Sequence, residues 1–251
     1  MPTEDGQPLL RLDRLSKRFG DLLAVDALSL EVAPGEIYGL IGPNGSGKTT
    51  TVKMITGLFR PTAGQVLIGG IDLGAEPERA KRLTGYIPDE PFVYEKMTGR
   101  EFLQLVGELY GVAEPGRRGR LEELLAVYDL GPLADGYVEN YSRGNRQKLA
   151  ILASLLHRPR LLVVDEPIVG LDPESAVKTR DLLKRFAESG GSVLVCTHTL
   201  PFAEQVCHRV GLLKEGRLVQ EGDLPTLRHR AGLPAASLEA LYLHFTNSRA
   251  P

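Results

Sequence analysis

The 251-residue sequence has little cysteine, no long uninterrupted hydrophobic run and no excess of charge of either sign. Cys196 and Cys207 do not form a C-x-x-C pair, so we interpret both as packing residues rather than as a disulfide or a metal site. Charged residues such as Asp165 and Glu166 interrupt the longest apolar segments, which excludes a membrane-spanning helix. The first residues are acidic and lack the apolar core of a secretory signal, so we expect a cytoplasmic protein.

The balance of charge also restricts the partners. Lysine and arginine number 30 against 32 aspartate and glutamate residues, for a formal net charge of −2. Nucleic-acid binding usually needs a basic face, so no nucleic-acid partner is expected. With 42% hydrophobic and 25% charged residues, the chain has enough apolar surface for either one large α/β domain or a core with an inserted subdomain.

The clearest motif is a phosphate loop. The pattern G-x-x-x-x-G-K-S/T is matched by Gly42, Pro43, Asn44, Gly45, Ser46, Gly47, Lys48 and Thr49, followed by Thr50. An apolar run at 37–41 predicts a buried parallel strand before the loop, and residues 50–58 favour a helix after it. Glycines let the backbone aim N–H groups at phosphate oxygens. Lys48 would reach the β- and γ-phosphates, and the Thr49 hydroxyl would bind Mg²⁺.

The N-terminal part is predicted to be β-structure. Residues 9–15 and 24–32 alternate apolar and polar side chains, which is typical of half-exposed strands. Phe19 lies in the turn between them, where it either packs in the core or stacks on an adenine. Residues 65–71 favour a short hairpin, and 83–87 a strand that ends before Asp89.

Residues from about 90 to 158 contain no convincing strand. Thr98 and Glu101 fit a capping box before a helix, and further helices are expected from Leu121 and from Gly144 to Leu156. We interpret 111–119 as a linker whose arginine cluster at 117–120 is a solvated loop face. This stretch is therefore predicted to be an all-helical insertion in an α/β core.

The core resumes with an apolar strand at 161–164, and Asp165 and Glu166 follow it directly. A helix is expected at about 173–189, a strand at 192–197 that ends at His198, and a hairpin over 210–220. The chain is thus predicted to be a single domain. Its core spans about 9–88 and 159–222, its helical subdomain about 90–158, and its C-terminal tail, with helical fragments, about 223–251.

These parts predict nucleotide hydrolysis. Asp165 is placed to hold Mg²⁺ through a water, and Glu166 to polarise the attacking water. His198 either steadies the γ-phosphate or the water, or is a structural histidine. Ser142 and Gly144 at the start of a helix can present a hydroxyl and free N–H groups to an anion.

The combination resembles the ATP-binding cassette ATPase family from about Leu10 to Gly222. The resemblance implies an α/β P-loop NTPase (RecA-like) fold with a mainly parallel core, an N-terminal antiparallel β subdomain and an inserted all-helical subdomain. It implies that Phe19 stacks on adenine, that Lys48, Glu166 and His198 are catalytic, and that Asp172 belongs to a subunit-contact loop. It also implies that Ser142, Gly144 and Asn145 belong to the family signature, which covers ATP bound to a second cassette.

Two features depart from the family pattern, the signature and the residue at position 89. The signature carries Arg143 and Asn145 where the family usually has Gly and Gln, and Asp89 stands where the family usually has Gln. Asp89 can still ligate Mg²⁺, but it adds negative charge beside a triphosphate. Both departures are similar to those in the branch that serves simple two-component exporters.

The resemblance implies an ATP-hydrolysing transporter subunit with ATP and Mg²⁺ as cofactors. Its expected partners are an integral membrane permease at the cytoplasmic face of the membrane and a second cassette, which is a copy of this chain or a relative. The cluster at 92–94, Phe-Val-Tyr, either contacts the permease or packs inside. The alternative function is a non-transport cassette that acts as a regulatory or mechanical module; the intact Lys48, Asp165, Glu166 and His198 disfavour a binding-only cassette.

Overall fold

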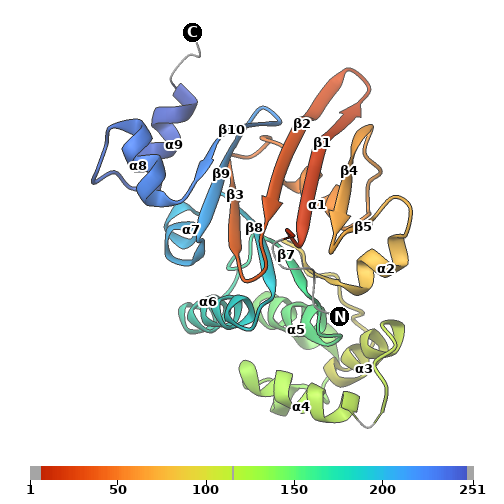
Figure 1. Ribbon diagram of the computed structural model, residues 1–251. Coiled ribbons are helices and arrows are strands. Elements are labelled where there is room, and N and C mark those ends of the chain that lie inside the picture. The colour runs from red at the N-terminus through yellow and green to blue at the C-terminus, as the bar shows by residue number, and fades with distance from the viewer. Residues whose placement is uncertain (1–6, 115, 248–251) are drawn as a thin grey trace.

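The computed structural model describes residues 7–114 and 116–247, which form two sheets and a helical layer (Figure 1). The N-terminal sheet is antiparallel and has the strand order β2-β1-β4-β5. Its strands are β1 (Leu10–Phe19), β2 (Leu22–Val32), β4 (Ala63–Ile68) and β5 (Ile71–Asp72). The predicted β subdomain is confirmed.

The second sheet has six strands in the order β10-β9-β3-β8-β7-β6, and all neighbours are parallel except β9 and β10. The strands are β3 (Ile37–Ile41), β6 (Thr84–Ile87), β7 (Leu161–Asp165), β8 (Ser192–Thr197), β9 (Arg209–Lys214) and β10 (Arg217–Gly222). Every residue of β3, β7 and β8 is buried, as expected for central parallel strands that are covered on both faces.

Helices cover the sheets. The core carries α1 (Lys48–Ile55), α2 (Pro77–Arg82), α6 (Pro173–Glu188) and α7 (Leu200–Val206). Between β6 and β7 lie α3 (Gly99–Leu109), α4 (Gly116–Val127), α5 (Arg143–Leu155) and the 3₁₀ turns at Gly131–Leu133 and Val138–Asn140. Thr98 caps α3 by the predicted capping box, in which the Thr98 and Glu101 side chains each accept a hydrogen bond from the other's backbone N–H.

The expectation of a linker at 111–119 was wrong, because α4 already begins at Gly116. The arginine cluster lies on this helix and not on a solvated loop. The Arg117 guanidinium contacts Glu108 and Glu114, each at 3.1 Å, and its side chain is only 14% exposed. These ion pairs satisfy the charge, so the helix can continue through a segment whose glycines suggested a loop. The short helices α2 and α7 were not expected either.

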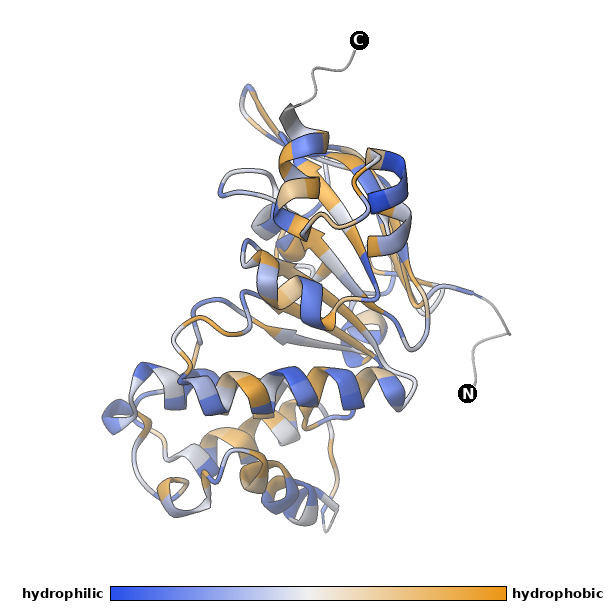
Figure 2. Cartoon of the chain, turned by 90° about the vertical axis from the view of Figure 1, so that its left-hand side faces the viewer, coloured by the Kyte–Doolittle hydropathy of each residue, from blue (hydrophilic) through white to orange (hydrophobic). Residues whose placement is uncertain are grey.

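The C-terminal residues form α8 (Leu224–Ala231) and α9 (Leu238–Asn247). Leu238 and Leu241 of α9 share a buried cluster with Ile41 of β3 and Leu212 of β9, so this end of the chain is part of the packed core. Figure 2 shows hydrophobic residues gathered along the inner strands, while the outer helices alternate hydrophobic and hydrophilic residues. Among the described residues, no helix has the length and apolarity needed to cross a membrane.

Candidate active site

Three neighbouring strands of the parallel sheet bring the predicted chemistry to one edge. The phosphate loop follows β3, Asp165 ends β7, and His198 follows β8, which lies between the other two. Because the carboxyl ends of parallel strands meet at the same edge, these residues come together although more than 100 positions separate Lys48 from Asp165 (Figure 1).

The phosphate loop is tightly built around its glycines. A Cβ on Gly42 would lie 2.4 Å from Ser46 Oγ and 2.5 Å from the Leu213 carbonyl oxygen. Gly47 has φ +107°, and a Cβ there would lie 2.7 Å from the Ala24 carbonyl oxygen. Only glycine fits at either position without displacing backbone.

Two polar groups of the loop are oriented for an anion. The Lys48 ammonium donates to the carbonyl oxygens of Gly42 at 2.6 Å and Pro43 at 3.0 Å. Ser46 Oγ is buried and has no hydrogen-bond partner. A buried hydroxyl without a partner is costly, and a phosphate oxygen would satisfy it. The donors present therefore suit the phosphates of a nucleotide.

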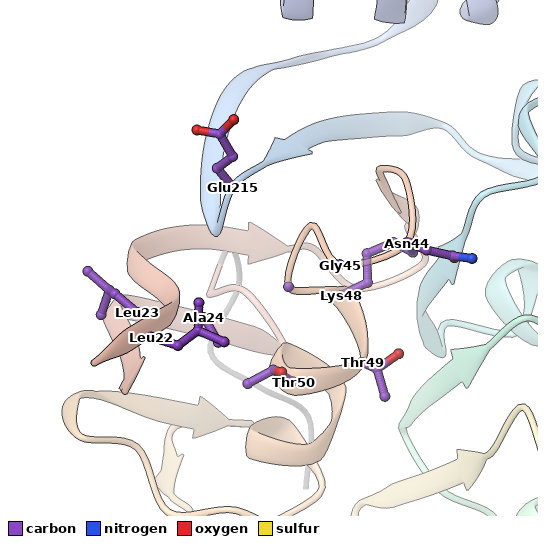
Figure 3. A pocket seen from close by; sticks show the side chains of 10 residues that line it. Leu22, Leu23, Ala24, Asn44, Gly45, Lys48, Thr49, Thr50 and Glu215 are labelled. Atoms are coloured by element: carbon purple, nitrogen blue, oxygen red, sulfur yellow. The ribbon is translucent and has the colours of Figure 1, made fainter. Parts of the chain in front are cut away.

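A cavity of about 540 Å³ lies beside the loop and is large enough for a nucleotide (Figure 3). In Figure 3, Leu22, Leu23 and Ala24 of β2 lie on one side of α1 and Thr49 on the other. Phe19 is not among the residues that line this cavity. Its ring packs edge-on against Phe59, with ring centroids 5.5 Å apart.

Sequence reasoning missed the contribution of the hairpin between β9 and β10. Glu215 lines the cavity, and the next residue, Gly216, donates from its N–H to the Ser46 carbonyl oxygen at 2.9 Å. The Gly216 carbonyl in turn accepts from the N–H of Asp26 at 2.9 Å. The hairpin thus ties the phosphate loop to β2. Local sequence carries no signal of this contact.

Asp165 and Thr49 form the region suited to a cation. Asp165 is buried and accepts a hydrogen bond from the Thr49 hydroxyl. Burial, together with the charges of Glu166 and Asp89, raises the pKa of Asp165 to about 6. Among the described residues, no three His, Cys, Asp or Glu side chains converge as a metal cluster. A cation bound here would need most of its ligands from phosphate oxygens and water.

Glu166 is held in a strained and specific orientation. Its φ of +50° is rare for a residue with a side chain, and such strain often occurs at functional sites. The carboxylate accepts hydrogen bonds from Thr197 Oγ1 at 2.7 Å, the His198 N–H at 2.9 Å and His198 Nδ1 at 2.6 Å. The structure therefore places the predicted Glu166 and His198 in direct contact.

The signature residues form a second group, at the N-termini of α5 and α6. Ser142 caps α5 and accepts from the Asn145 N–H at 3.2 Å, and a Cβ on Gly144 would lie 3.0 Å from the Gly170 carbonyl oxygen. Asp172 caps α6. Hydrogen bonds from Ser175 and Lys148 hold the pKa of Asp172 well below its usual range. Asp172 thus stays ionised at its helix N-terminus.

Comparisons with known proteins agree with this geometry. The family model described as ABC transporter matches residues 25–169. Relatives include the linearmycin resistance ATP-binding protein LnrL of Bacillus subtilis (strain 168), 34% identical over 89% of this chain and 72% of that protein. The daunorubicin/doxorubicin resistance ATP-binding protein DrrA of Streptomyces peucetius is 36% identical over 94% of this chain and 71% of that protein.

Solved structures give the same result. The ATP-binding subunit of an ABC transporter matches with a TM-score of 0.91 at 35% identity, covering 95% of this chain and 99% of that one. A dimeric ATP-binding cassette in a post-hydrolysis state, bound to ADP and Pi, matches with a TM-score of 0.78 at 27% identity, covering 86% and 98%. The predicted fold and ATPase activity are confirmed, and the chain belongs to the ABC transporter family as one of its ATP-hydrolysing cassettes.

Proposed function

We propose that this chain is the ATPase subunit of an exporter, in which ATP binding closes two cassettes and hydrolysis switches a separate membrane permease. The observation that carries the proposal is the division of the site into two groups on one chain. The phosphate loop, Asp165, Glu166 and His198 form one group, and the signature residues around Ser142 form the other. A second cassette can supply the missing group to each site.

Nucleotide binding begins at the phosphate loop. Phosphate oxygens would take over the Lys48 ammonium from the carbonyls of Gly42 and Pro43, and would satisfy the Ser46 hydroxyl. The base and ribose would extend along the cavity toward Leu22 and Leu23. We retain Phe19 as the adenine-stacking residue, which requires its ring to leave Phe59 when ATP binds.

The oxygen donors near Asp165 fit a hard cation. The Thr49 hydroxyl and the Asp165 carboxylate would hold Mg²⁺, with Asp89 as a further ligand from the end of β6. When bound, Mg²⁺ would neutralise charge on the phosphates. The raised pKa of Asp165 is consistent with this assignment, since burial and the charges of Glu166 and Asp89 disfavour its ionised form more than Lys48 favours it.

Glu166 and His198 would act on the attacking water. The hydrogen bonds from Thr197 and His198 orient the Glu166 carboxylate, which then accepts a proton from the water as it attacks the γ-phosphate. His198, whose side chain is 53% exposed, is free to reach the γ-phosphate from the same side. Lys48 stabilises the charge that develops on the transferred phosphoryl group.

Pairing of two cassettes is tested with Glu166→Gln protein. This variant should bind Mg-ATP but hydrolyse it about 10²–10⁴-fold more slowly. We expect light scattering to detect a dimer with Mg-ATP and a monomer without it. The matched control is Glu174→Gln, an exposed glutamate on α6, which should hydrolyse ATP as the wild type does. If Glu166→Gln protein stays monomeric at high Mg-ATP, pairing with a copy of itself in isolation is wrong.

The permease is proposed to contact Phe92 and Tyr94. These rings are 78% and 51% exposed and lie edge-on to each other, with centroids 6.0 Å apart. Phe92 lines a largely apolar cavity of about 530 Å³ between the core and the helical subdomain. Within the cluster at 92–94, Val93 packs against the core, and the half-exposed Tyr94 lies edge-on to the buried Phe102 with ring centroids 6.2 Å apart. Two exposed aromatic rings beside an apolar cavity favour a protein partner at this position.

Association with a permease is tested by affinity purification of the chain from detergent-solubilised native membranes, followed by mass spectrometry of the proteins recovered with it. A polytopic membrane protein recovered in comparable amount supports the transporter. Recovery from the soluble fraction alone, with intact ATPase activity, would favour the regulatory module. Phe92→Ala with Tyr94→Ala should abolish the recovery, whereas the control pair Leu133→Ala with Tyr137→Ala, also exposed on the helical subdomain, should not.

Export is proposed from the names of the relatives. The first relatives are named for drug resistance, and a further one is the Nod factor export ATP-binding protein I of Burkholderia thailandensis, 36% identical over 85% of this chain and 70% of that protein. Purified complex in vesicles should accumulate a candidate drug in the lumen only when Mg-ATP is supplied outside, because the active complexes then have their cassettes outside and an exporter moves the drug away from its cassettes. Transport in the importing direction would contradict the proposal.

A further inference from the structure

The C-terminal helix α9 reaches the catalytic edge of the sheet. A second cavity, of about 320 Å³, also borders the phosphate loop and shares Asn44 with the nucleotide cavity. Its lining includes Pro43 and Asn44 of the loop, His198 and Leu200 after β8, and Tyr242 of α9. Tyr242 contributes a phenol ring to this lining, beside the imidazole of His198. Residues about 200 positions apart thus share one wall of the active site.

Helix α9 is firmly attached to the core. Leu238 and Leu241 are fully buried against Ile41, the residue that immediately precedes the phosphate loop. The Lys214 ammonium donates to the Thr246 carbonyl oxygen at 2.5 Å, and Glu204 of α7 accepts from the Leu238 N–H at 3.3 Å. These contacts hold α9, and with it the backbone of Tyr242, in place relative to β3 and α7.

The His198 side chain faces the cavity that Tyr242 also lines. One ring nitrogen is bonded to Glu166, but 53% of the side chain is exposed, so few contacts limit its rotation. Ordering a mobile side chain costs conformational entropy at each turnover, and a ring held in the lining of the same cavity would reduce that cost by limiting the space open to the imidazole. Misplacement of a catalytic group by about 1 Å can slow a reaction roughly 10²-fold.

We propose that Tyr242 is a positioning residue, whose ring limits the motion of His198 and of the Pro43–Asn44 segment so that both face the γ-phosphate. The proposal rests on the function proposed above. The sequence supplied no interpretation of the C-terminal helix, and the proposal assigns this helix a part in hydrolysis. The ring and not the hydroxyl is required, since the cavity is mostly apolar.

The kinetic test uses the full chain. Tyr242→Ala should lower kcat about tenfold and change the KM for ATP by less than about twofold, because the ring acts on the reacting geometry and not on ATP binding. Tyr242→Phe should restore kcat. The matched control, Leu243→Ala, changes the neighbouring residue, which is 49% exposed and does not line the cavity, and should behave as the wild type.

A double-mutant cycle separates positioning from general destabilisation. In a His198→Ala background, Tyr242→Ala should cause little further loss, because the two residues act together. Equal losses in both backgrounds, or an unchanged kcat in Tyr242→Ala, would overturn the proposal. If the wild-type chain hydrolyses no ATP, the proposed function itself fails instead.

A binding measurement gives a readout that does not depend on turnover. The chain contains no tryptophan, so Tyr242→Trp introduces a single fluorescent reporter beside the phosphate loop. Its emission should shift on addition of Mg-ATP, whereas that of Leu243→Trp should not. An unresponsive Tyr242→Trp in protein that binds ATP by equilibrium dialysis would overturn the role of Tyr242 and leave the proposed function intact.

Discussion

Asp165 and Glu166 are adjacent in the chain but have different surroundings. Asp165 ends β7 and meets the Thr49 hydroxyl, whereas Glu166, with φ +50°, turns toward His198. The order of residues after an apolar strand was enough to predict two roles for the two carboxylates. The left-handed backbone of Glu166 was not predictable, because a non-glycine residue adopts it only where surrounding contacts compensate the strain.

At the residue scale, Asp89→Asn tests the metal assignment. Removal of a ligand should raise the Mg²⁺ concentration for half-maximal ATPase about fivefold, equivalent to roughly 1 kcal/mol. It should also lower the pKa of Asp165, since Asp89 is one of the charges that raise it. A Mg²⁺ titration at saturating ATP is the measurement, with Glu90→Gln, the neighbouring exposed carboxylate, as control. An unchanged Mg²⁺ requirement would mean that Asp89 is not a ligand.

At the scale of elements, His157 joins the helical subdomain to the parallel sheet. It follows α5, stacks on Tyr110 with ring centroids 3.8 Å apart, and donates from Nε2 to the Thr84 carbonyl oxygen of β6 at 3.1 Å. Burial lowers its pKa, and the hydrogen bond to Thr84 offsets part of this effect. Nδ1 is buried without a partner, so protonation would bury an unpaired N–H.

Because the folded-state pKa of His157 is depressed, its contribution to stability is present above the unfolded pKa of about 6.5 and is lost as pH falls through the folded pKa. His157→Gln keeps a donor for Thr84 but cannot be charged. We expect the variant to be about 1 kcal/mol less stable at pH 7.5, roughly 2–4 °C in Tm, and this difference to shrink toward pH 5. Thermal melts across that range are the measurement, and a difference that is constant with pH contradicts the assignment.

Elements with strong local signals were predicted well. The capping box of α3 and the apolar runs of β3, β7 and β8 depend on residues close in sequence. The start of α4 was misplaced because its glycines favour a loop, and ion pairs of Arg117 with Glu108 and Glu114 outweigh that preference. The short helices α2 and α7 offered too few residues for a periodic pattern.

At the scale of the whole molecule, the two groups of site residues predict complementation. Lys48→Ala and Ser142→Arg should each abolish ATPase activity alone, because one spoils the phosphate loop and the other the signature. In a head-to-tail dimer, a 1:1 mixture places both intact groups at one of the two sites in half of the dimers, so about a quarter of wild-type activity should return. Activity of the mixed proteins in a coupled assay is the measurement, and mixing each variant with itself is the control. No recovery would argue against pairing of identical chains.

The sequence by itself determined the class of chemistry. The spacing of the phosphate loop, the Asp165–Glu166 pair after an apolar strand and the signature near Ser142 are local patterns, and each can be recognised without knowing its neighbours in space. They were sufficient to predict a nucleotide and the candidate hydrolytic residues, and the family resemblance that they carry implied a second cassette.

Only the tertiary structure decided which distant segments complete the site. The strand order β3-β8-β7 places His198 between the phosphate loop and Glu166. The hairpin at Glu215 and Gly216 closes on Ser46, and α9 places Tyr242 beside Pro43. The physical reason is that contacts between segments far apart in sequence are set by strand order and by packing in a shared core, and neither leaves a periodic or compositional signal in the segments themselves.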